Sequence, residues 1–385
     1  MKDPVPTVRR GPHAVAVTGS AVLSAPGRGV RPLLAAVLDG APAFAPVRRF
    51  DVAGRRTTWA AAHSGDPVLA DELDRAVTEA CDQAGLSTAQ RADCPLYLAV
   101  HGDPALPRVP GPDRTAHGVD AFAAAVARRA GLFGRSRAYT SACVASGTAV
   151  ADAAAELAHG QAERIVVAAG YLVEADQFAV FEAGRALARD GRVRPFSSGR
   201  TGLLLGDGVV AVVLEAASSA RARRAESLAL LAGWGRAGDA YHVCRPRPDG
   251  AGLARAITDA LHRGGIGPER VGYVNAHGSG TLVGDTAEAA ALHLALGESA
   301  ATVPVSSTKS VHGQALEAGS LLELVVTIEA LRAGRLPVNA GHLGPDPACP
   351  LNLILDRAVS TDADHALSLS SAFGGANTAL LVGTP

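Results

Sequence analysis

The sequence predicts an α/β protein with a largely parallel sheet, built from two related halves. Short apolar runs alternate with alanine-rich stretches of helical periodicity through all 385 residues. The run at 206–215 is apolar almost throughout, as in a strand buried on both faces. A polar, basic stretch at 218–226 is a plausible junction, and the alternation resumes after it. We therefore expect one half at residues 13–217 and the other at residues 227–385.

The expected strands and helices follow from apolar periodicity and from the glycines that end several helices. In the first half we expect strands at 14–19, 94–102, 137–141, 164–170 and 206–215, and helices at 69–84, 120–131 and 146–160. In the second half we expect strands at 227–235, 303–309, 351–356 and 378–383, a strand running into a loop at 271–281, and helices at 252–265, 285–297 and 320–334.

Composition narrows the class of protein. Hydrophobic residues make up 48% of the chain, charged residues 19%, and the net charge is −1, which favours a globular protein without a nucleic-acid or membrane-surface partner. The five cysteines form no CxxC pair and show no zinc-ligand spacing, so we expect free thiols and no metal site. No segment reaches the roughly 18 apolar residues of a membrane helix. Gly19 and Ser20 interrupt the apolar N-terminal run, which favours a strand over a signal peptide. We therefore expect a cytoplasmic protein.

Cys143 lies in the segment YTSACVASGTAV, between an expected short strand and an expected helix. At a helix N-terminus the positive end of the helix dipole favours thiolate over thiol. Backbone N–H groups of the same turn can form an oxyanion hole, and the small neighbouring residues leave room for an acyl group. Cys143 is therefore a candidate nucleophile, with a buried structural cysteine as the alternative.

Two further segments place polar side chains near strand ends. His277, in NAHGSGT, follows an apolar strand, and Ser279 and Thr281 add hydroxyls suited to a polar substrate arm. A surface histidine is the alternative. Lys309 is one of only two lysines in an arginine-rich chain. A specific need for the compact charge of lysine would explain it, and chance is the alternative. Glu323 in the following expected helix is a candidate charge partner for Lys309.

Phe373 precedes the pair Gly374 and Gly375 near the end of the chain. A ring on a glycine hinge suits a gate, and a β-turn with an inward aromatic is the alternative. No GxGxxG motif opens a helix after the first strand, and no Walker loop or GxSxG motif is present, which argues against nucleotide binding and a serine hydrolase.

Taken in order, these segments resemble the β-ketoacyl synthases of fatty-acid and polyketide assembly, from about residue 13 to residue 383. The resemblance is carried by AVAVTGSAVLSAPG, SACVASGTAV, RPFSSGRTGLLLGDGVVAVVLE, VNAHGSGTLVGDTAE, STKS and SAFGGAN, while PDPACPLN resembles the type II polyketide branch. It implies a thiolase-like fold in which the two halves form a five-layered αβαβα core. It also implies a dimer in which the strand before Cys143 continues the sheet across the interface.

The resemblance assigns roles to individual residues. It makes Cys143 the nucleophile and His277 and Lys309 further catalytic residues. Substrate or pantetheine contacts fall on Ser279, Thr281, Phe373 and Gly374, and supporting roles on Asp285, Glu288, Glu323 and His312.

One departure from the family pattern concerns the mechanism. Gln314, five residues after Lys309, stands where the family has a second catalytic histidine, and His312 lies two residues earlier. An amide can donate a hydrogen bond to an enolate oxygen but cannot titrate, so formation of the thiolate would rest on the helix dipole and His277. A swing of His312 into the site is an alternative.

Two smaller departures follow. Glu317-Ala-Gly-Ser replaces a Gly-Ala-Ala-Gly pattern, and Ala372 replaces a glycine before Phe373.

The resemblance implies a condensing enzyme. Cys143 would take an acyl group from an acyl carrier protein, and decarboxylative Claisen condensation with malonyl-carrier protein would follow, in polyketide or fatty-acyl biosynthesis. The alternatives are an acyltransferase that moves acyl groups between carrier proteins without condensation, and a non-condensing subunit resembling a chain-length factor. No cofactor is expected, because the substrates arrive on phosphopantetheine of a carrier protein or on coenzyme A. The expected partners are the carrier protein and either a second copy or a ketosynthase/chain-length-factor-like subunit.

Overall fold

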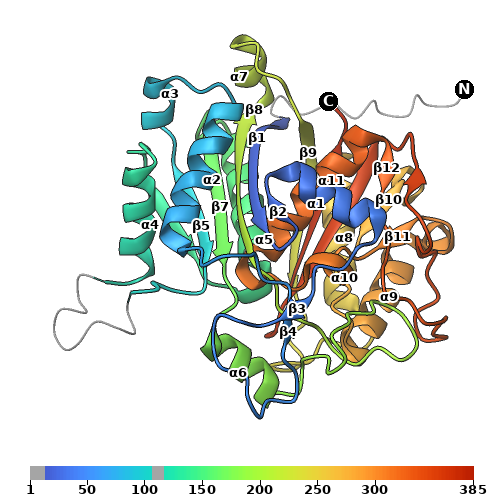
Figure 1. Ribbon diagram of the computed structural model, residues 1–385. Helices are drawn as coiled ribbons and strands as arrows, with labels where there is room; N and C mark the ends of the chain where they lie inside the picture. Colours follow the sequence, from blue (N-terminus) through green and yellow to red (C-terminus); the bar gives the residue numbers. More distant parts are fainter. Residues whose placement is uncertain (1–13, 106–116) are drawn as a thin grey trace, which may run out of the picture.

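The computed structural model describes residues 14–105 and 117–385 (Figure 1). Within these residues eleven strands form one sheet in the order β11-β10-β14-β15-β9-β1-β8-β7-β5-β6, with β2 beside β1. The strands are β1 Val15–Ser24, β2 Gly27–Arg28, β5 Leu96–Val100, β6 Ser136–Tyr139, β7 Arg164–Tyr171, β8 Gly208–Ala216, β9 Ala229–Gly238, β10 Tyr273–Asn275, β11 Val305–Ser306, β14 His365–Ser371 and β15 Ala376–Gly383. Two small sheets pair β3 Ala45–Pro46 with β4 Trp59–Ala60, and β12 Arg335–Leu336 with β13 Val359–Ser360.

The two halves of the sheet repeat one topology. In the first, β6, β5 and β7 are parallel, and β8 and β1 continue the sheet antiparallel. In the second, β11, β10 and β14 are parallel, and β15 and β9 continue it antiparallel. The halves meet where β1 pairs with β9. The duplicated α/β fold expected from the sequence is confirmed, while the bounds 13–217 and 227–385 stay a prediction, and residue 13 lies outside the described part.

The helices form three layers around the sheet (Figure 1). They are α1 Val30–Asp39, α2 Leu69–Gln83, α3 Thr88–Ala92, α4 Val119–Arg129, α5 Ala145–Ala158, α6 Ala175–Ala183, α7 Ala217–Ala222, α8 Ala251–Gly264, α9 Leu282–Leu296, α10 Lys309–His312 and α11 Gly319–Ala333. Helices α2 and α4 pack on the outer face of the first half, and α8 and α9 on that of the second. Helices α5 and α11 lie between the halves, which gives the five-layered αβαβα arrangement.

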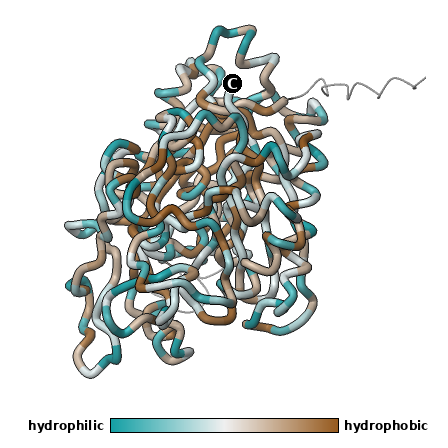
Figure 2. The backbone as a smooth tube through the Cα atoms, turned by 90° about the vertical axis from the view of Figure 1, so that its right-hand side faces the viewer, coloured by the Kyte–Doolittle hydropathy of each residue, from teal (hydrophilic) through white to brown (hydrophobic). Residues whose placement is uncertain are grey.

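Burial explains why these helices differ in composition. The outer helix α2 buries one face through Leu73, Val77 and Ala80 and keeps charges on the other. Helix α11 is buried almost all round because it lies in the central layer. Figure 2 shows the same contrast, with apolar backbone gathered inside and hydrophilic segments outside.

Glycines let the outer helices approach the sheet closely. A Cβ on Gly233 of β9 would lie 2.0 Å from the backbone oxygen of Ala260 in α8. A Cβ on Gly19 of β1 would lie 2.1 Å from the backbone oxygen of Ala80 in α2. Because β1 and β9 hold equivalent places in the two halves, the same close contact is built twice.

Two expected strands differ from the structure. The strand expected at 351–356 is wrong: there only Leu353 makes a single bridge, to Val305. The apolar side chains of this run pack onto the second-half core without joining a ladder. The strand expected at 303–309 is shorter, because the chain leaves the sheet after Ser306 and Lys309 begins α10.

Other elements were missed by the periodicity. Strand β14 and helices α1 and α6 were not expected, and the junction at 218–226 begins inside α7. Within residues 14–105 and 117–385, no helix combines the length and the apolar character needed to cross a membrane.

Candidate active site

Cys143 sits at a sharp turn between β6 and α5. The one-turn helix η3 (Ala142–Val144) leads directly into α5, and Ala142 has a left-handed φ of 51°. The Ser320 hydroxyl donates to the Cys143 carbonyl oxygen at 2.9 Å, and the Leu321 N–H donates to the Ser146 hydroxyl at 3.1 Å. Helix α11 thereby fixes the turn that carries the thiol.

Burial works against a thiolate at Cys143. The residue is 9% exposed, and burial raises the pKa of its thiol to about 12. The charge of Glu317 raises this pKa as well, while Lys309 lowers it. Burial therefore opposes the thiolate that the helix N-terminus was expected to favour.

His277 lies on the loop after β10 and is held from two sides. Its N–H and that of Gly278 donate to the two Glu288 oxygens, at 2.6 and 2.7 Å. Its carbonyl oxygen accepts from the Lys309 ammonium at 2.8 Å. Burial, together with Lys309, lowers the pKa of His277 well below its usual value, so the imidazole is neutral. Its Nδ1 is buried and has no hydrogen-bond partner within residues 14–105 and 117–385.

The acid pair of α9 supports this loop, as expected from the sequence. Asp285 accepts from the N–H groups of Phe196 and Gly280, at 2.8 and 3.1 Å. Burial raises the pKa of both Asp285 and Glu288 to about 7. Both carboxyl groups fix the backbone of the loop, and Glu288 also lines the cavity described below, whereas Asp285 does not.

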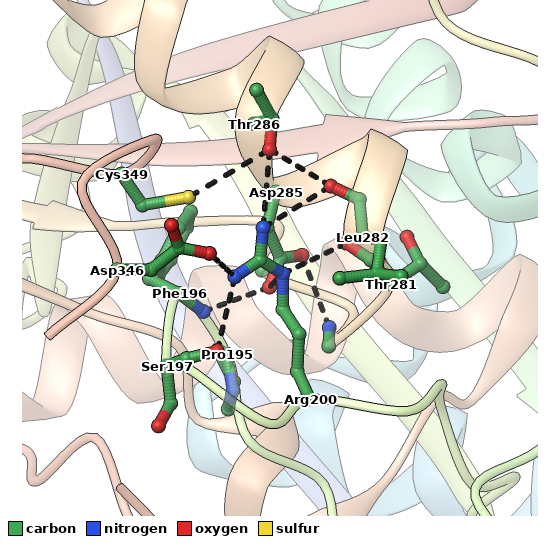
Figure 3. Close-up of polar contacts among 12 residues, drawn as sticks. Pro195, Phe196, Ser197, Arg200, Thr281, Leu282, Asp285, Thr286, Asp346 and Cys349 are labelled. Carbon is green, nitrogen blue, oxygen red and sulfur yellow. Dashed lines mark hydrogen bonds and ion pairs between the residues drawn. The ribbon is translucent and has the colours of Figure 1, made fainter. Parts of the chain in front are cut away.

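Arg200 is a supporting residue that the sequence reasoning missed (Figure 3). Its guanidinium lies 3.6 Å from Asp285, forms an ion pair with Asp346, and donates to the Leu282 carbonyl oxygen at 3.2 Å. It thus ties the segment RPFSSGR to the first turn of α9 and to the PDPACPLN stretch. Arg200 lies in RPFSSGRTGLLLGDGVVAVVLE, a segment that resembles the family, and this position could have identified it from the sequence.

Lys309 and Glu323 form a buried ion pair, as the sequence suggested. Burial raises the pKa of Glu323 to about 7, and Lys309 acts in the opposite direction. Lys309 is buried and its ammonium points to the backbone of His277, so it supports the histidine loop.

Gln314 faces the same space as Cys143 and His277, whereas His312 does not. The Gln314 backbone is fixed by hydrogen bonds with Leu204 and Gly206. Its side-chain oxygen is buried and finds no hydrogen-bond partner in the part of the chain that the structure describes. Both ring nitrogens of His312 are bonded inside the protein, to the Gly313 carbonyl and the Thr308 hydroxyl. The alternative in which His312 swings into the site is therefore disfavoured.

A cavity of about 540 Å³ joins these residues. Cys143, His277 and Gln314 line it, with Ser279, Thr281, Phe373 and Glu288. The predicted contact Gly374 does not line it; its N–H donates to the Val243 carbonyl oxygen at 2.9 Å. Lys309, Asp285, Glu323 and His312 also lie outside its lining.

The cavity mouth includes a residue pair that the sequence did not reveal. The ring of Phe373 stacks on that of Phe181 from α6, with centroids 5.9 Å apart. Phe373 is 52% exposed, and both rings line the cavity. Phe373 therefore lies at the cavity opening against α6, and its role as a gate stays a prediction.

A nucleophile turn and a histidine loop that face one cavity in a duplicated αβαβα fold define a thiolase-like acyl-transfer protein. The chain belongs to the β-ketoacyl synthase family. Residues 75–220 match the family's "Beta-ketoacyl synthase, N-terminal domain", and residues 228–342 match its "Beta-ketoacyl synthase, C-terminal domain". The resemblance drawn from the sequence is confirmed.

Named relatives agree with this assignment. The 3-oxoacyl-[acyl-carrier-protein] synthase 2 of Coxiella burnetii is 30% identical over 405 residues, covering 96% of this chain and 98% of the relative. The synthase of the same name from Staphylococcus aureus is 38% identical over 205 residues, covering 52% of this chain and 51% of the relative.

Solved structures share the whole fold. The ishigamide ketosynthase/chain length factor has a TM-score of 0.89 at 28% identity, covering 97% of this chain and 99% of that one. A β-ketoacyl synthase from Burkholderia phymatum STM815 has a TM-score of 0.88 at 27% identity, covering 97% and 100%. A type II ketosynthase bound to its acyl carrier protein, at 24% identity and a TM-score of 0.89, covers 97% and 100% and shares the fold.

Proposed function

We propose that the chain is a ketosynthase-type condensing enzyme that loads an acyl group on Cys143 and extends it by two carbons in fatty-acyl or polyketide biosynthesis. The observation that carries this proposal is the convergence of Cys143, His277 and Gln314, from three separate segments, on one cavity of about 540 Å³. The names of the relatives support an acyltransferase of the 3-oxoacyl-[acyl-carrier-protein] synthase type.

In the loading step the Cys143 sulfur attacks the thioester carbonyl of an acyl carrier protein, and the pantetheine thiol leaves. Backbone N–H groups at the start of α5 are suited to the oxyanion that forms. Ser279 and Thr281 hydrogen-bond to each other at 3.0 Å and line the cavity, where their hydroxyls suit the polar pantetheine arm. The substrates bring their own phosphopantetheine, so the reaction requires no further cofactor.

In the condensing step malonyl-carrier protein loses carbon dioxide, and the resulting enolate attacks the acyl-cysteine. A carbon–carbon bond forms, the bond to the Cys143 sulfur breaks, and the departing thiolate takes a proton from solvent to return as thiol. Neutral His277 can donate an N–H to the enolate oxygen, and the Gln314 amide can donate a second. Gln314 cannot move a proton, so its role is limited to stabilising charge.

The proposed assembly uses the free edge of the sheet. Strand β6 ends the described sheet order, so its outer edge is open to pair with a second copy or with a chain-length-factor-like subunit. The carrier protein would dock at the cavity mouth, where Arg245 lines the opening and suits the phosphate of the pantetheine arm.

Intact-mass spectrometry tests the proposal. The protein and its Cys143→Ala variant are incubated with acyl-carrier protein and then with malonyl-carrier protein. We expect an acyl adduct on the wild type alone, followed by release of carbon dioxide and an elongated product. An adduct without elongation would support the alternative of an acyltransferase, and no adduct with any donor would support a non-condensing subunit.

A Gln314→His variant separates two forms of the proposal. Condensation by the wild type itself indicates that the amide is a working donor. Condensation that appears only in Gln314→His indicates a degenerate site.

A further inference from the structure

Glu317 lies at the sheet edge that carries the nucleophile. Strands β7, β5 and β6 are parallel neighbours, so their carboxyl ends lie together. Tyr171 ends β7, His101 follows β5, and the Cys143 turn follows β6. The one-turn helix η6 (Leu316–Ala318) packs against η3 and against the ends of β5 and β7. Glu317 is thereby brought from the second half of the chain to the residues around Cys143.

The two carboxylate oxygens of Glu317 have different surroundings. The residue is 3% exposed. Oε1 lies 3.1 Å from Nδ1 of His101, whose side chain is 64% exposed. Oε2 is buried and has no hydrogen-bond partner among the described residues. One oxygen therefore contacts an imidazole that reaches solvent, and the other is free to accept a hydrogen bond inside the protein.

The groups around this pair fix its charge. The hydrogen bond that His101 donates to Glu317 raises the pKa of His101, and nearby Asp176 and Glu174 act in the same direction. Among the described residues the hydroxyl of Tyr171 is buried without a hydrogen-bond partner, and burial raises its pKa well above the usual value, so it stays protonated. Glu317 is thus hydrogen-bonded to an imidazole whose pKa is raised.

The other candidate bases at the site are weak or engaged. Gln314 cannot titrate. Burial lowers the pKa of His277 well below its ordinary value and that of His312 to about 3. Lys309 is paired with Glu323 and donates to a backbone carbonyl. Transfer of the Cys143 thiol proton therefore needs an acceptor other than His277 or His312.

We propose that Glu317 accepts the proton of the Cys143 thiol during acyl loading across a bridging water, through Oε2, and that His101 passes this proton to solvent. The proposal deepens the proposed function and rests on it. Glu317 stands where the family pattern has a glycine, three residues after Gln314. The chain thus has an amide in place of the second histidine and a carboxyl group in place of a nearby glycine.

The step balances without any further reactant. As the sulfur of Cys143 bonds to the acyl carbon, its S–H bond breaks and the proton moves to Glu317. The carbon–sulfur bond of the donor thioester breaks, and the leaving pantetheine thiolate takes a proton from solvent. Glu317 then returns to carboxylate by losing its proton through His101.

Two measurements on Glu317→Gln distinguish a base from a structural residue. The first is the rate of acyl loading, followed by intact mass from pH 5.5 to 9. The second is the rate of Cys143 alkylation by iodoacetamide, which reports the thiolate fraction at equilibrium. We expect loading at neutral pH to fall by about 10²-fold or more, the scale of a general base. We expect alkylation to become faster, because removal of the negative charge lowers the thiol pKa.

Conservative variants and a matched control complete the test. Glu317→Asp should recover part of the loading rate, and His101→Gln should change the pH profile of loading. Glu329→Gln, a substitution of the same kind in α11 beside Arg332, should leave both rates unchanged. Circular dichroism shows whether each variant folds.

The outcomes separate this proposal from the proposed function. Equal or faster loading by Glu317→Gln would overturn the base, and so would equal slowing of loading and alkylation, which indicates structural damage. Absence of loading in the wild type, with every thioester tried, would instead overturn the proposed function.

Discussion

The ammonium group of Lys309 lies 2.8 Å from the carbonyl oxygen of His277 and forms a buried ion pair with Glu323 of α11. One cation thus joins the histidine loop to the helix that also fixes the Cys143 turn through Ser320. The two sides of the cavity are set by the same helix, so a change at this ion pair should affect stability and acyl loading together.

Glu323→Leu should strongly destabilise the protein, because it leaves the Lys309 ammonium buried without its counterion. We expect a loss of about 3–5 kcal/mol in the free energy of unfolding, measured by urea denaturation. The double variant Lys309→Met/Glu323→Leu should recover most of this loss, since it removes both charges. A single variant within about 1 kcal/mol of wild type would contradict the importance of the pair.

His312→Asn should weaken the dependence of stability on acid. Burial lowers the pKa of His312 to about 3 in the folded protein, against about 6.5 when unfolded. The neutral imidazole therefore contributes stability that is present above pH 6.5 and is lost as the pH falls toward 3. This loss is about 1.4 kcal/mol per pH unit, and the variant should lack it. Urea denaturation at pH 7, 6 and 5 measures the slope, with exposed His159→Asn as the control; equal slopes would refute the prediction.

Gly233→Ala should destabilise the contact between β9 and α8. A Cβ there would lie 2.0 Å from the Ala260 backbone oxygen, so strand and helix must separate. We expect a loss of about 3 kcal/mol or more. Gly238→Ala on the same strand meets nothing within 4 Å and should change stability by no more than about 0.5 kcal/mol. Similar thermal unfolding of the two variants would show that the contact relaxes.

Phe373→Ala should open the cavity mouth by removing the ring that stacks on Phe181. An aromatic pair contributes about 0.5–1.5 kcal/mol, which corresponds to roughly two- to tenfold in an opening equilibrium. We therefore expect Cys143 to be alkylated by iodoacetamide faster by that factor. Phe133→Ala, which removes a highly exposed ring elsewhere, should leave the rate unchanged. No acceleration would show that the ring does not limit access.

Gln314→Ala should separate the two chemical steps. The amide is expected to stabilise the enolate and not the loading step, so condensation should fall by about 10²-fold while the acyl adduct on Cys143 still forms. Rates of adduct formation and of carbon dioxide release are measured on the same sample. Loss of the adduct as well would place Gln314 in the loading step.

Local pattern was sufficient for much of the fold. The helix expected at 69–84 is found at Leu69–Gln83, because its apolar spacing reflects one buried face. The periodicity predicted a strand at 351–356, where the apolar residues pack without forming a β-ladder. It also extended the strand at 303–309 too far, because the chain already enters α10 at Lys309. Helix α6 was not predicted, although its Phe181 stacks on the ring of Phe373 at the cavity opening.

The order of the family motifs predicted one site for Cys143, His277 and Gln314, because each motif has a fixed place along the chain. The sequence alone thus determined the duplicated α/β fold and three residues of the cavity, Cys143, His277 and Gln314. Only the tertiary structure decided that Cys143 is buried, which raises the pKa of its thiol, and that His101 meets Glu317 across 216 positions of sequence. Burial and charge act through space, so the protonation of a group depends on neighbours that its local sequence does not contain.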